Sequence, residues 1–183
     1  MSFGKKKTVL RSIRISQELD ELLQKDAKNK RISVNALIST MMTKYAEWDR
    51  FADKFGYVTL TSETFKTILE ITDEKKLSEL AKVIGARLPK EVMLFWFKKT
   101  DLEAFLSYVD LYGKYSDLFQ YELDKEGDRY TITAHHELGE NWSTFLKIFI
   151  GEAMKDTLGI IPEFEVSKSS IVARFSERPN VEG

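Results

Sequence analysis

The sequence has no cysteine, only two histidines and three prolines, and no apolar run that approaches the roughly 20 residues needed to span a bilayer. The lack of cysteine excludes disulfides, thiolate nucleophiles and zinc sites built on thiolates. The basic start, residues 1–7, is not followed by the apolar stretch of a signal peptide. These absences predict a cytoplasmic protein that does not enter the membrane and carries no metal ion or other cofactor.

Charge is unevenly distributed, although the formal net charge is only -1. Residues 1–50 hold eleven basic and six acidic side chains, which leaves seventeen basic and twenty-three acidic side chains for the rest. An unopposed positive segment favours contact with a polyphosphate such as DNA, or forms a solvated basic tail. Five basic residues precede Glu18, the first acidic residue: Lys5, Lys6, Lys7, Arg11 and Arg14.

The first fifty or so residues predict one strand followed by two helices. Residues Thr8–Ile15 are rich in β-branched and long side chains, which favours a strand. Ser16 is a good cap for a helix over Gln17–Asn29, where apolar residues recur at helical spacing. Ser33 is a candidate cap for a second helix, whose apolar pattern continues toward Phe55.

One strand cannot form a sheet by itself, and a fragment of about fifty residues buries too little apolar surface to be stable alone. The simplest partner is the same strand of a second copy, which gives a two-stranded antiparallel ribbon with the helix pairs packed below it. We therefore predict a dimeric module over residues 1–55. Gly56 is the expected helix stop, because glycine accepts the left-handed conformation, and a second domain is expected over residues 56–183.

Two segments carry a resemblance to a known family. Leu10–Ile15 (LRSIRI) and Arg31–Asn35 (RISVN) resemble the two signatures of the ribbon-helix-helix (Arc/MetJ/CopG) DNA-binding family, at about its usual separation. The resemblance covers residues 8–50 only. It implies that a two-stranded ribbon enters the major groove, where each base pair shows a distinct pattern of hydrogen-bonding groups.

The resemblance also assigns individual contacts. Leu10, Ser12 and Arg14 occupy its three base-facing positions, where arginine suits guanine, serine accepts several bases and leucine packs on a thymine methyl. Leu10 departs from the usual polar choice, which favours an A·T-rich contact. Arg11 departs as well, as a charge on the expected core face, and is expected to reach a phosphate. The predicted phosphate contacts are Lys5, Lys6, Lys7 and Arg11, together with Ser33, Val34 and Asn35 at the start of the second helix, where free N–H groups attract anions.

The remaining residues predict helices and two antiparallel hairpins, so the fold class of the whole chain is expected to be α+β. We expect a short strand over residues 58–61 and helices over 62–71, 73–86 and 89–98. A capping box of Thr100 and Glu103 then opens a helix to about residue 113. Alternating apolar residues predict a hairpin with a turn at 126–128, a helix over 141–158 that ends at Gly159, and a second hairpin over 163–167 and 171–176.

The second domain offers little catalytic chemistry, because the sequence has no phosphate-binding glycine loop, no cysteine nucleophile and no spaced pair of histidines. His135 and His136 are strand neighbours that face opposite sides and cannot share one metal ion. His136 falls on the apolar face and is expected to be a hydrogen-bonded core or edge histidine. His135 is on the polar face, where it is solvated or lines a ligand site with Glu137, or with Glu163 and Glu165.

The run Val92–Phe97 is apolar on all sides of a helix and therefore predicts a buried helix. We interpret it first as core or subunit interface and second as the wall of a pocket for a small-molecule effector. The candidate effector-site residues are Trp96, Tyr108, Tyr112, His135 and Trp142.

These observations predict a transcriptional regulator that binds double-stranded DNA in a sequence-specific way, as a homodimer or a higher homo-oligomer. The second domain would serve assembly or effector sensing, and the protein is not expected to be an enzyme. One alternative is an antitoxin-type regulator whose C-terminal part binds a toxin. It fits less well, because antitoxin tails are commonly disordered alone, whereas this domain is patterned to fold. The other alternative, an enzyme with an accessory DNA-binding head, is disfavoured by the missing chemistry.

Overall fold

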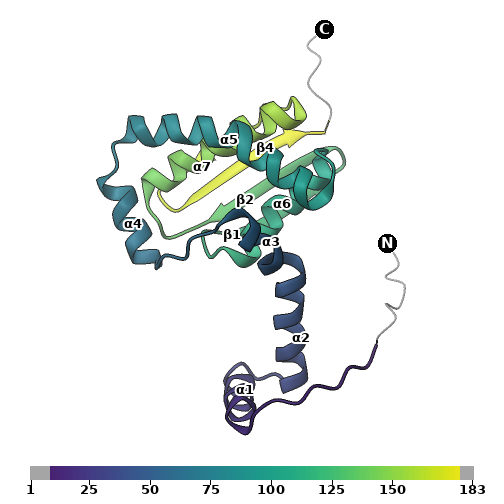
Figure 1. Ribbon diagram of the computed structural model, residues 1–183. Coiled ribbons are helices and arrows are strands. Elements are labelled where there is room, and N and C mark those ends of the chain that lie inside the picture. The colour runs from purple at the N-terminus through teal and green to yellow at the C-terminus, as the bar shows by residue number, and fades with distance from the viewer. Residues whose placement is uncertain (1–8, 178–183) are drawn as a thin grey trace. The chain divides into compact units, whose positions relative to one another are not determined.

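The structure of the chain, a computed structural model, describes residues 9–177. The chain divides into two compact units, residues 1–46, which we call the head, and residues 47–183, which we call the body. The sequence predicted a boundary after residue 55, so this division places residues 47–55 with the body. Figure 1 shows the elements of both units.

The two helices of the head follow the predicted bounds closely. Helix α1 is Gln17–Asn29, and the Ser16 hydroxyl accepts a hydrogen bond from the backbone N–H of Leu19. Helix α2 is Val34–Lys44, and Ser33 caps it. Both predicted serine caps are therefore confirmed.

The strand predicted over Thr8–Ile15 is not formed by the described part of that stretch, residues 9–15, in the single chain. Residues 9–16, the described part of this stretch that leads up to α1, have no regular secondary structure. A strand is defined by hydrogen bonds to a neighbour, and all four strands of the described residues lie in the body. The ribbon of a ribbon-helix-helix fold is thus not shown by the isolated chain.

The helical run continues beyond α2 to the predicted end. A π-helical turn, η1 (Tyr45–Asp49), is followed by α3 (Arg50–Phe55). Gly56 then takes the left-handed conformation at φ 67°, which confirms the predicted stop. The predicted strand over residues 58–61 is wrong, because no strand of the described residues pairs with this stretch and Thr61 instead caps the next helix.

Three further helices precede the sheet, and two of their predicted starts are corrected. Helix α4 is Ser62–Ile71, as predicted. Helix α5 is one helix, Glu74–Phe97, with Pro89 inside it, so the predicted break before residue 89 is wrong. Helix α6 is Leu102–Tyr115, and its cap is Asp101, whose carboxylate accepts from the Ala104 N–H at 2.9 Å, in place of the predicted Thr100.

The sheet has four antiparallel strands in the order β1-β2-β4-β3. Its first hairpin is β1 (Gln120–Glu126) and β2 (Arg129–His135), joined by the predicted turn with Gly127 at φ 65°. Its second hairpin is β3 (Glu163–Val166) and β4 (Ser170–Ser176). Strands β2 and β4 pair in the centre, with Ile132 opposite Ala173. The α+β class and both predicted hairpins are confirmed.

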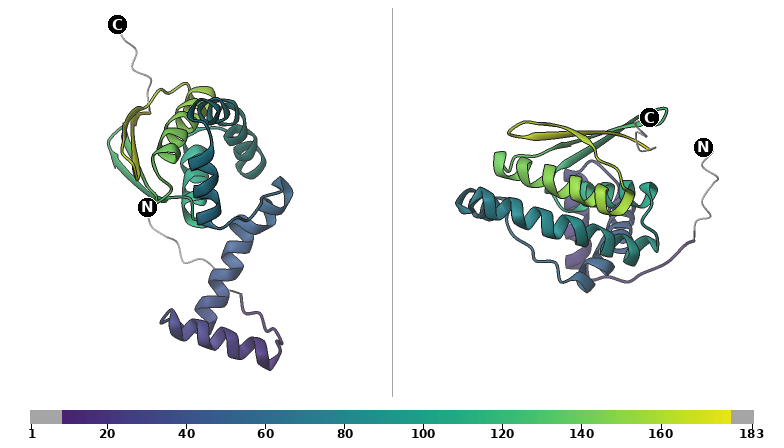
Figure 2. Two further views of the ribbon diagram at one scale, coloured as in Figure 1. Left: turned by 90° about the vertical axis from the view of Figure 1, so that its left-hand side faces the viewer. Right: turned by 90° about the horizontal axis from the view of Figure 1, so that it is seen from above.

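Helix α7 (Glu140–Leu158) is the central layer of the body and ends at Gly159, as predicted. The sheet lies on one side of α7 and α5 on the other, as both views of Figure 2 show. The approach of α5 to α7 is close at Gly85, where an added Cβ would lie 2.7 Å from the backbone oxygen of Phe149. Buried apolar side chains of the helices and of β2 and β4 fill these layers as one core.

Candidate nucleic-acid interface

The extended segment before α1 presents the residues predicted to contact bases. Leu10 is 90% exposed, and Ser12 and Arg14 are exposed as well. The apolar residue Ile13 is also 57% exposed. Once the segment is paired as a strand, Leu10, Ser12 and Arg14 share one face, so the segment can offer alternate side chains to a groove.

The start of α2 forms the second part of the candidate interface. The Ser33 hydroxyl accepts from the Ala36 N–H at 3.1 Å. In residues 9–177, no hydrogen bond is found for the N–H groups of Val34 and Asn35. Arg31 stands just before this helix end, exposed and with a left-handed backbone at φ 55°. Two free N–H donors and a nearby guanidinium suit an anion such as a phosphate.

The two helix starts of the head differ in charge. The first turn of α1 carries Glu18 and Asp20, which already complement the positive end of its helix dipole. The first turn of α2 carries no acidic residue. An anion is therefore repelled at the start of α1 and not at the start of α2.

The predicted phosphate contacts fall into three groups. Ser33, Val34 and Asn35 come together at the start of α2. Arg11 lies on the extended segment and is exposed, in keeping with a charge that does not enter a core. Lys5, Lys6 and Lys7 lie outside the described residues.

The head exposes most of its large apolar side chains. Among its described residues, only Ala27 and Leu37 are buried. Leu22 of α1 is 59% exposed, and Met41 of α2 is 55% exposed. Among residues 9–46, the exposed large apolar residues are Val9, Leu10, Ile13, Ile15, Leu19, Leu22, Ile32, Met41, Met42 and Tyr45. So many uncovered large apolar side chains in so short a segment are typical of a protein that lacks its partner.

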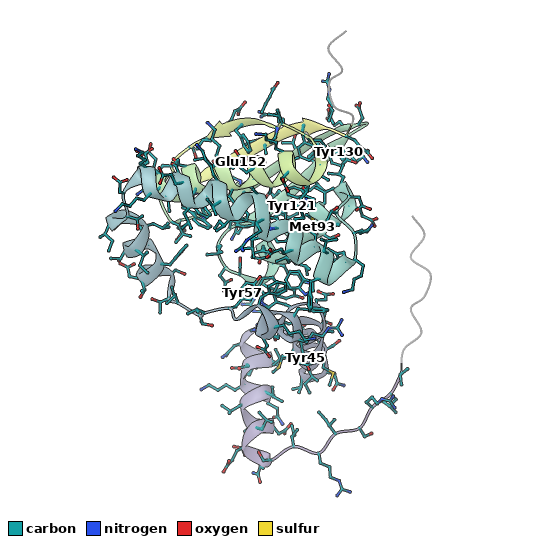
Figure 3. All side chains as sticks on the ribbon, turned by 45° about the horizontal axis from the view of Figure 1, so that its top comes forward. Tyr45, Tyr57, Met93, Tyr121, Tyr130 and Glu152 are labelled. Atoms are coloured by element: carbon teal, nitrogen blue, oxygen red, sulfur yellow. The ribbon has the colours of Figure 1, made fainter. Side chains whose placement is uncertain are left out.

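Three of the five candidate effector-site residues lie together in the body. Ring centroids are 6.4 Å apart between Trp96 and Tyr112 and 4.6 Å apart between Tyr108 and Tyr112. Trp48 packs at 5.0 Å from Tyr112, and the Tyr57 hydroxyl, labelled in Figure 3, bonds to that of Tyr112. Burial raises the pKa of Tyr108 and of Tyr112, so both hydroxyls stay protonated. Because aromatic rings fill this space, the cluster is packed core rather than an open cavity.

The other two candidates lie elsewhere. Trp142 packs against Phe65 at 5.3 Å and against Phe145 at 4.9 Å, within the core. His135 is exposed at the end of β2, opposite Ser170 of β4. The five predicted residues therefore do not form one site.

The polar face of the sheet does not bring His135 to a carboxylate site. The Glu165 carboxylate pairs with Arg174 at 2.6 Å, and Glu163 stands opposite Arg174 on β4. A hollow of about 820 Å³ is lined in part by Glu163 and Arg174, without His135. His136, by contrast, is buried and hydrogen-bonded to Ser143, which confirms the predicted core histidine.

A groove that the sequence did not indicate opens on the body between α3, α6 and β1. Its volume is about 700 Å³, and its lining includes Arg50, Phe51, Asp110 and Tyr121. No local pattern relates Tyr121 to α3, which lies seventy residues earlier in the sequence. Trp96 also lines this groove, and it is the one predicted effector residue that does so.

Comparison with models of known protein families finds no match, and comparison with curated protein sequences finds none either. Residues 9–177 contain no group of three or more His, Asp or Glu side chains placed to hold a metal ion. Over the same range, every helix is too short or too polar to cross a membrane.

Proposed function

We propose that the chain is a sequence-specific DNA-binding regulator of transcription that acts as a homodimer or a higher homo-oligomer. In the dimer, residues 8–15 of two copies pair as an antiparallel ribbon, which enters the major groove. The start of α2 in each copy binds a DNA phosphate and fixes the register of the ribbon without reading sequence.

The observation that carries this proposal is the incomplete head. An extended segment with no strand to pair with runs into two serine-capped helices, and their apolar faces are uncovered. Burial of one leucine side chain stabilises an assembly by about 1.5–3 kcal/mol. Covering Leu19 and Leu22 in both copies therefore favours a dimer, and pairing of the two segments satisfies their backbone N–H and C=O groups.

The charge of the head supports DNA as the partner. Arg11 and Arg14 lie on the exposed segment, and the start of α2 has two free N–H groups and no acid. These groups occupy the two places where the resembled family contacts DNA. The body has a core of its own, which fits a domain for assembly or sensing better than a tail that folds only around a toxin.

The proposal is tested by selecting sequences from random double-stranded DNA with the full-length chain. We expect an inverted repeat, because a two-fold symmetric dimer reads two half-sites. The affinity for the selected duplex should fall with salt at a slope of about 0.9 per phosphate contact on logarithmic axes. Failure to enrich any sequence, or an affinity that does not change with salt, would contradict the proposed function.

A further inference from the structure

The groove on the body has walls that suit a flat aromatic molecule. Phe51 of α3, Trp96 and Phe97 of α5, Leu106 of α6 and Tyr121 of β1 contribute its apolar lining. Figure 3 labels Tyr121 on the body. The volume of about 700 Å³ falls within the range of small-molecule sites, which are mainly apolar with a few placed polar groups.

Two opposite charges at the groove have no ion-pair partner. Its charged residues are Glu47, Arg50, Asp110 and Lys114. Lys114 pairs with Glu47 at 2.7 Å, and these two charges offset each other. Within residues 9–177, neither Arg50 nor Asp110 forms an ion pair. The groove therefore presents one uncompensated cation and one uncompensated anion.

Each of these two charges adjoins an aromatic wall. The Arg50 guanidinium lies 4.3 Å from the centroid of the Phe51 ring. Burial, and after it the charge of Asp110, raise the pKa of Tyr121 to about 12. Tyr121 is thus a protonated hydroxyl close to the Asp110 carboxylate. Arg50 and Asp110 thus each stand beside one aromatic residue of the same lining.

A buried donor in the lining also lacks an acceptor. The indole nitrogen of Trp96 is inaccessible to solvent and has no hydrogen-bond partner among the described residues. A ligand in the groove does not reach this nitrogen, so Trp96 contributes its ring to the wall and its N–H serves as a reporter of binding. Trp142 has a similarly unpaired indole nitrogen, but it does not line the groove.

We infer that this groove binds a small zwitterion with an aromatic side chain, of the chemical class of the aromatic α-amino acids. The ligand carboxylate pairs with Arg50, its ammonium group pairs with Asp110, and its ring packs between Phe51 and Tyr121. The inference concerns the body alone and does not depend on DNA binding by the head.

The test is calorimetric titration of the full-length chain, without DNA, with L-phenylalanine and two analogues. 3-Phenylpropionate lacks the ammonium group, and 2-phenylethylamine lacks the carboxylate. We expect L-phenylalanine to bind most tightly, with each analogue roughly tenfold weaker, since a hydrogen bond to a charged group contributes about 1.5–3 kcal/mol.

Two variants test which charged group of the ligand each groove residue binds. Arg50→Gln should weaken L-phenylalanine roughly tenfold and leave 2-phenylethylamine unchanged, because that analogue has no carboxylate. Asp110→Asn should weaken L-phenylalanine in the same way and leave 3-phenylpropionate unchanged. Arg87→Gln is the matched control, since Arg87 is an exposed arginine of α5 outside the groove. It should bind all three compounds like the wild type.

Nuclear magnetic resonance gives a second readout, which binding at a site far from the groove would not change. L-Phenylalanine should shift the indole N–H resonance of Trp96 and leave that of Trp142 in place, the two being assigned with Trp96→Phe and Trp142→Phe. The inference is overturned if millimolar L-phenylalanine produces no saturable heat, if an analogue binds as tightly as L-phenylalanine, or if Arg50→Gln and Asp110→Asn bind it like the wild type.

Discussion

The imidazole Nε2 of His136 lies 2.9 Å from the hydroxyl oxygen of Ser143, across the loop that joins β2 to α7. The other ring nitrogen, Nδ1, accepts a hydrogen bond from the Leu138 N–H at 3.3 Å. Because Nδ1 is an acceptor, the neutral ring carries its proton on Nε2 and donates it to Ser143. Both ring nitrogens are thus satisfied only while the ring is uncharged.

Protonation of His136 should destabilise the fold. Burial first, and the charge of neighbouring His135 second, lower the pKa of His136 below its ordinary value of 6.5. The unfolded chain therefore binds this proton more readily than the folded chain. The stability contributed by the neutral ring is fully present above about pH 6.5 and is lost as the pH falls toward the folded pKa. Urea unfolding at a series of pH values measures this loss.

His136→Asn should flatten the dependence of the unfolding free energy on pH in this window, because it removes the titrating group. His135→Asn is the comparison, since His135 is exposed at the adjoining end of β2. It removes only the second cause of the lowered His136 pKa and should keep most of the wild-type slope. An unchanged slope in His136→Asn would show that other groups cause the acid sensitivity.

Alanine at Gly85 should destabilise the body, although alanine is the better helix former. The change gains about 1 kcal/mol of helix propensity. The new Cβ would lie 2.7 Å from the carbonyl oxygen of Phe149, and overpacking against a backbone atom costs about 1–3 kcal/mol. Gly151→Ala is the control, because its Cβ would meet only the Phe164 ring at 3.5 Å. It should be neutral or stabilise by up to about 1 kcal/mol. Chemical denaturation compares the two variants.

Gly85 and Pro89 also show why the break predicted in α5 is absent. Proline favours the first turn of a helix, because it has no N–H and clashes with the turn before it. That local rule placed a helix start at residue 89. Pro89 is instead buried inside one helix. That helix packs closely on α7 near Gly85, against residues about sixty positions later in the sequence. Tertiary packing here outweighs the local preference.

The elements predicted correctly depend on local signals. The Ser16 and Ser33 caps and the stops at Gly56 and Gly159 are set by their own neighbours. Strands β2 and β4 belong to two hairpins that α7 separates in the sequence, so no local signal predicts their pairing. The ribbon strand depends on a second chain, so a single chain cannot show it. The groove at Arg50 depends on α3, α5, α6 and β1, which come from separate parts of the sequence.

A charge on the uncovered face of α1 should prevent assembly of the head. Leu22→Asp places a carboxylate where the proposed dimer buries a leucine side chain. The dimer loses about 1.5–3 kcal/mol of burial free energy per copy, and burying the charge adds a further cost. Sedimentation should find the wild type dimeric at micromolar concentration and Leu22→Asp monomeric. Val83→Asp is the control, because Val83 is also well exposed but lies on α5 of the body. A dimer that survives Leu22→Asp would rule out the proposed ribbon-helix-helix interface.

Arg14 and Arg11 are both exposed on the segment before α1, but the proposal gives them different roles on DNA. Arg14 faces the bases, where its guanidinium donates two parallel hydrogen bonds to a guanine edge. Arg14→Ala should therefore cost about 1–3 kcal/mol on the selected duplex and relax the preference at one position per half-site. Its affinity for a scrambled duplex should change far less.

Arg11→Ala is the matched comparison, because Arg11 is predicted to bind a phosphate. It should weaken the selected and the scrambled duplex alike and lower the salt slope by about one unit for each phosphate that is no longer neutralised. Fluorescence anisotropy with both duplexes over a range of salt concentrations separates the two patterns. If Arg14→Ala also weakened both duplexes equally, Arg14 would not read bases. The face formed by Leu10, Ser12 and Arg14 would then be assigned to the wrong side of the ribbon.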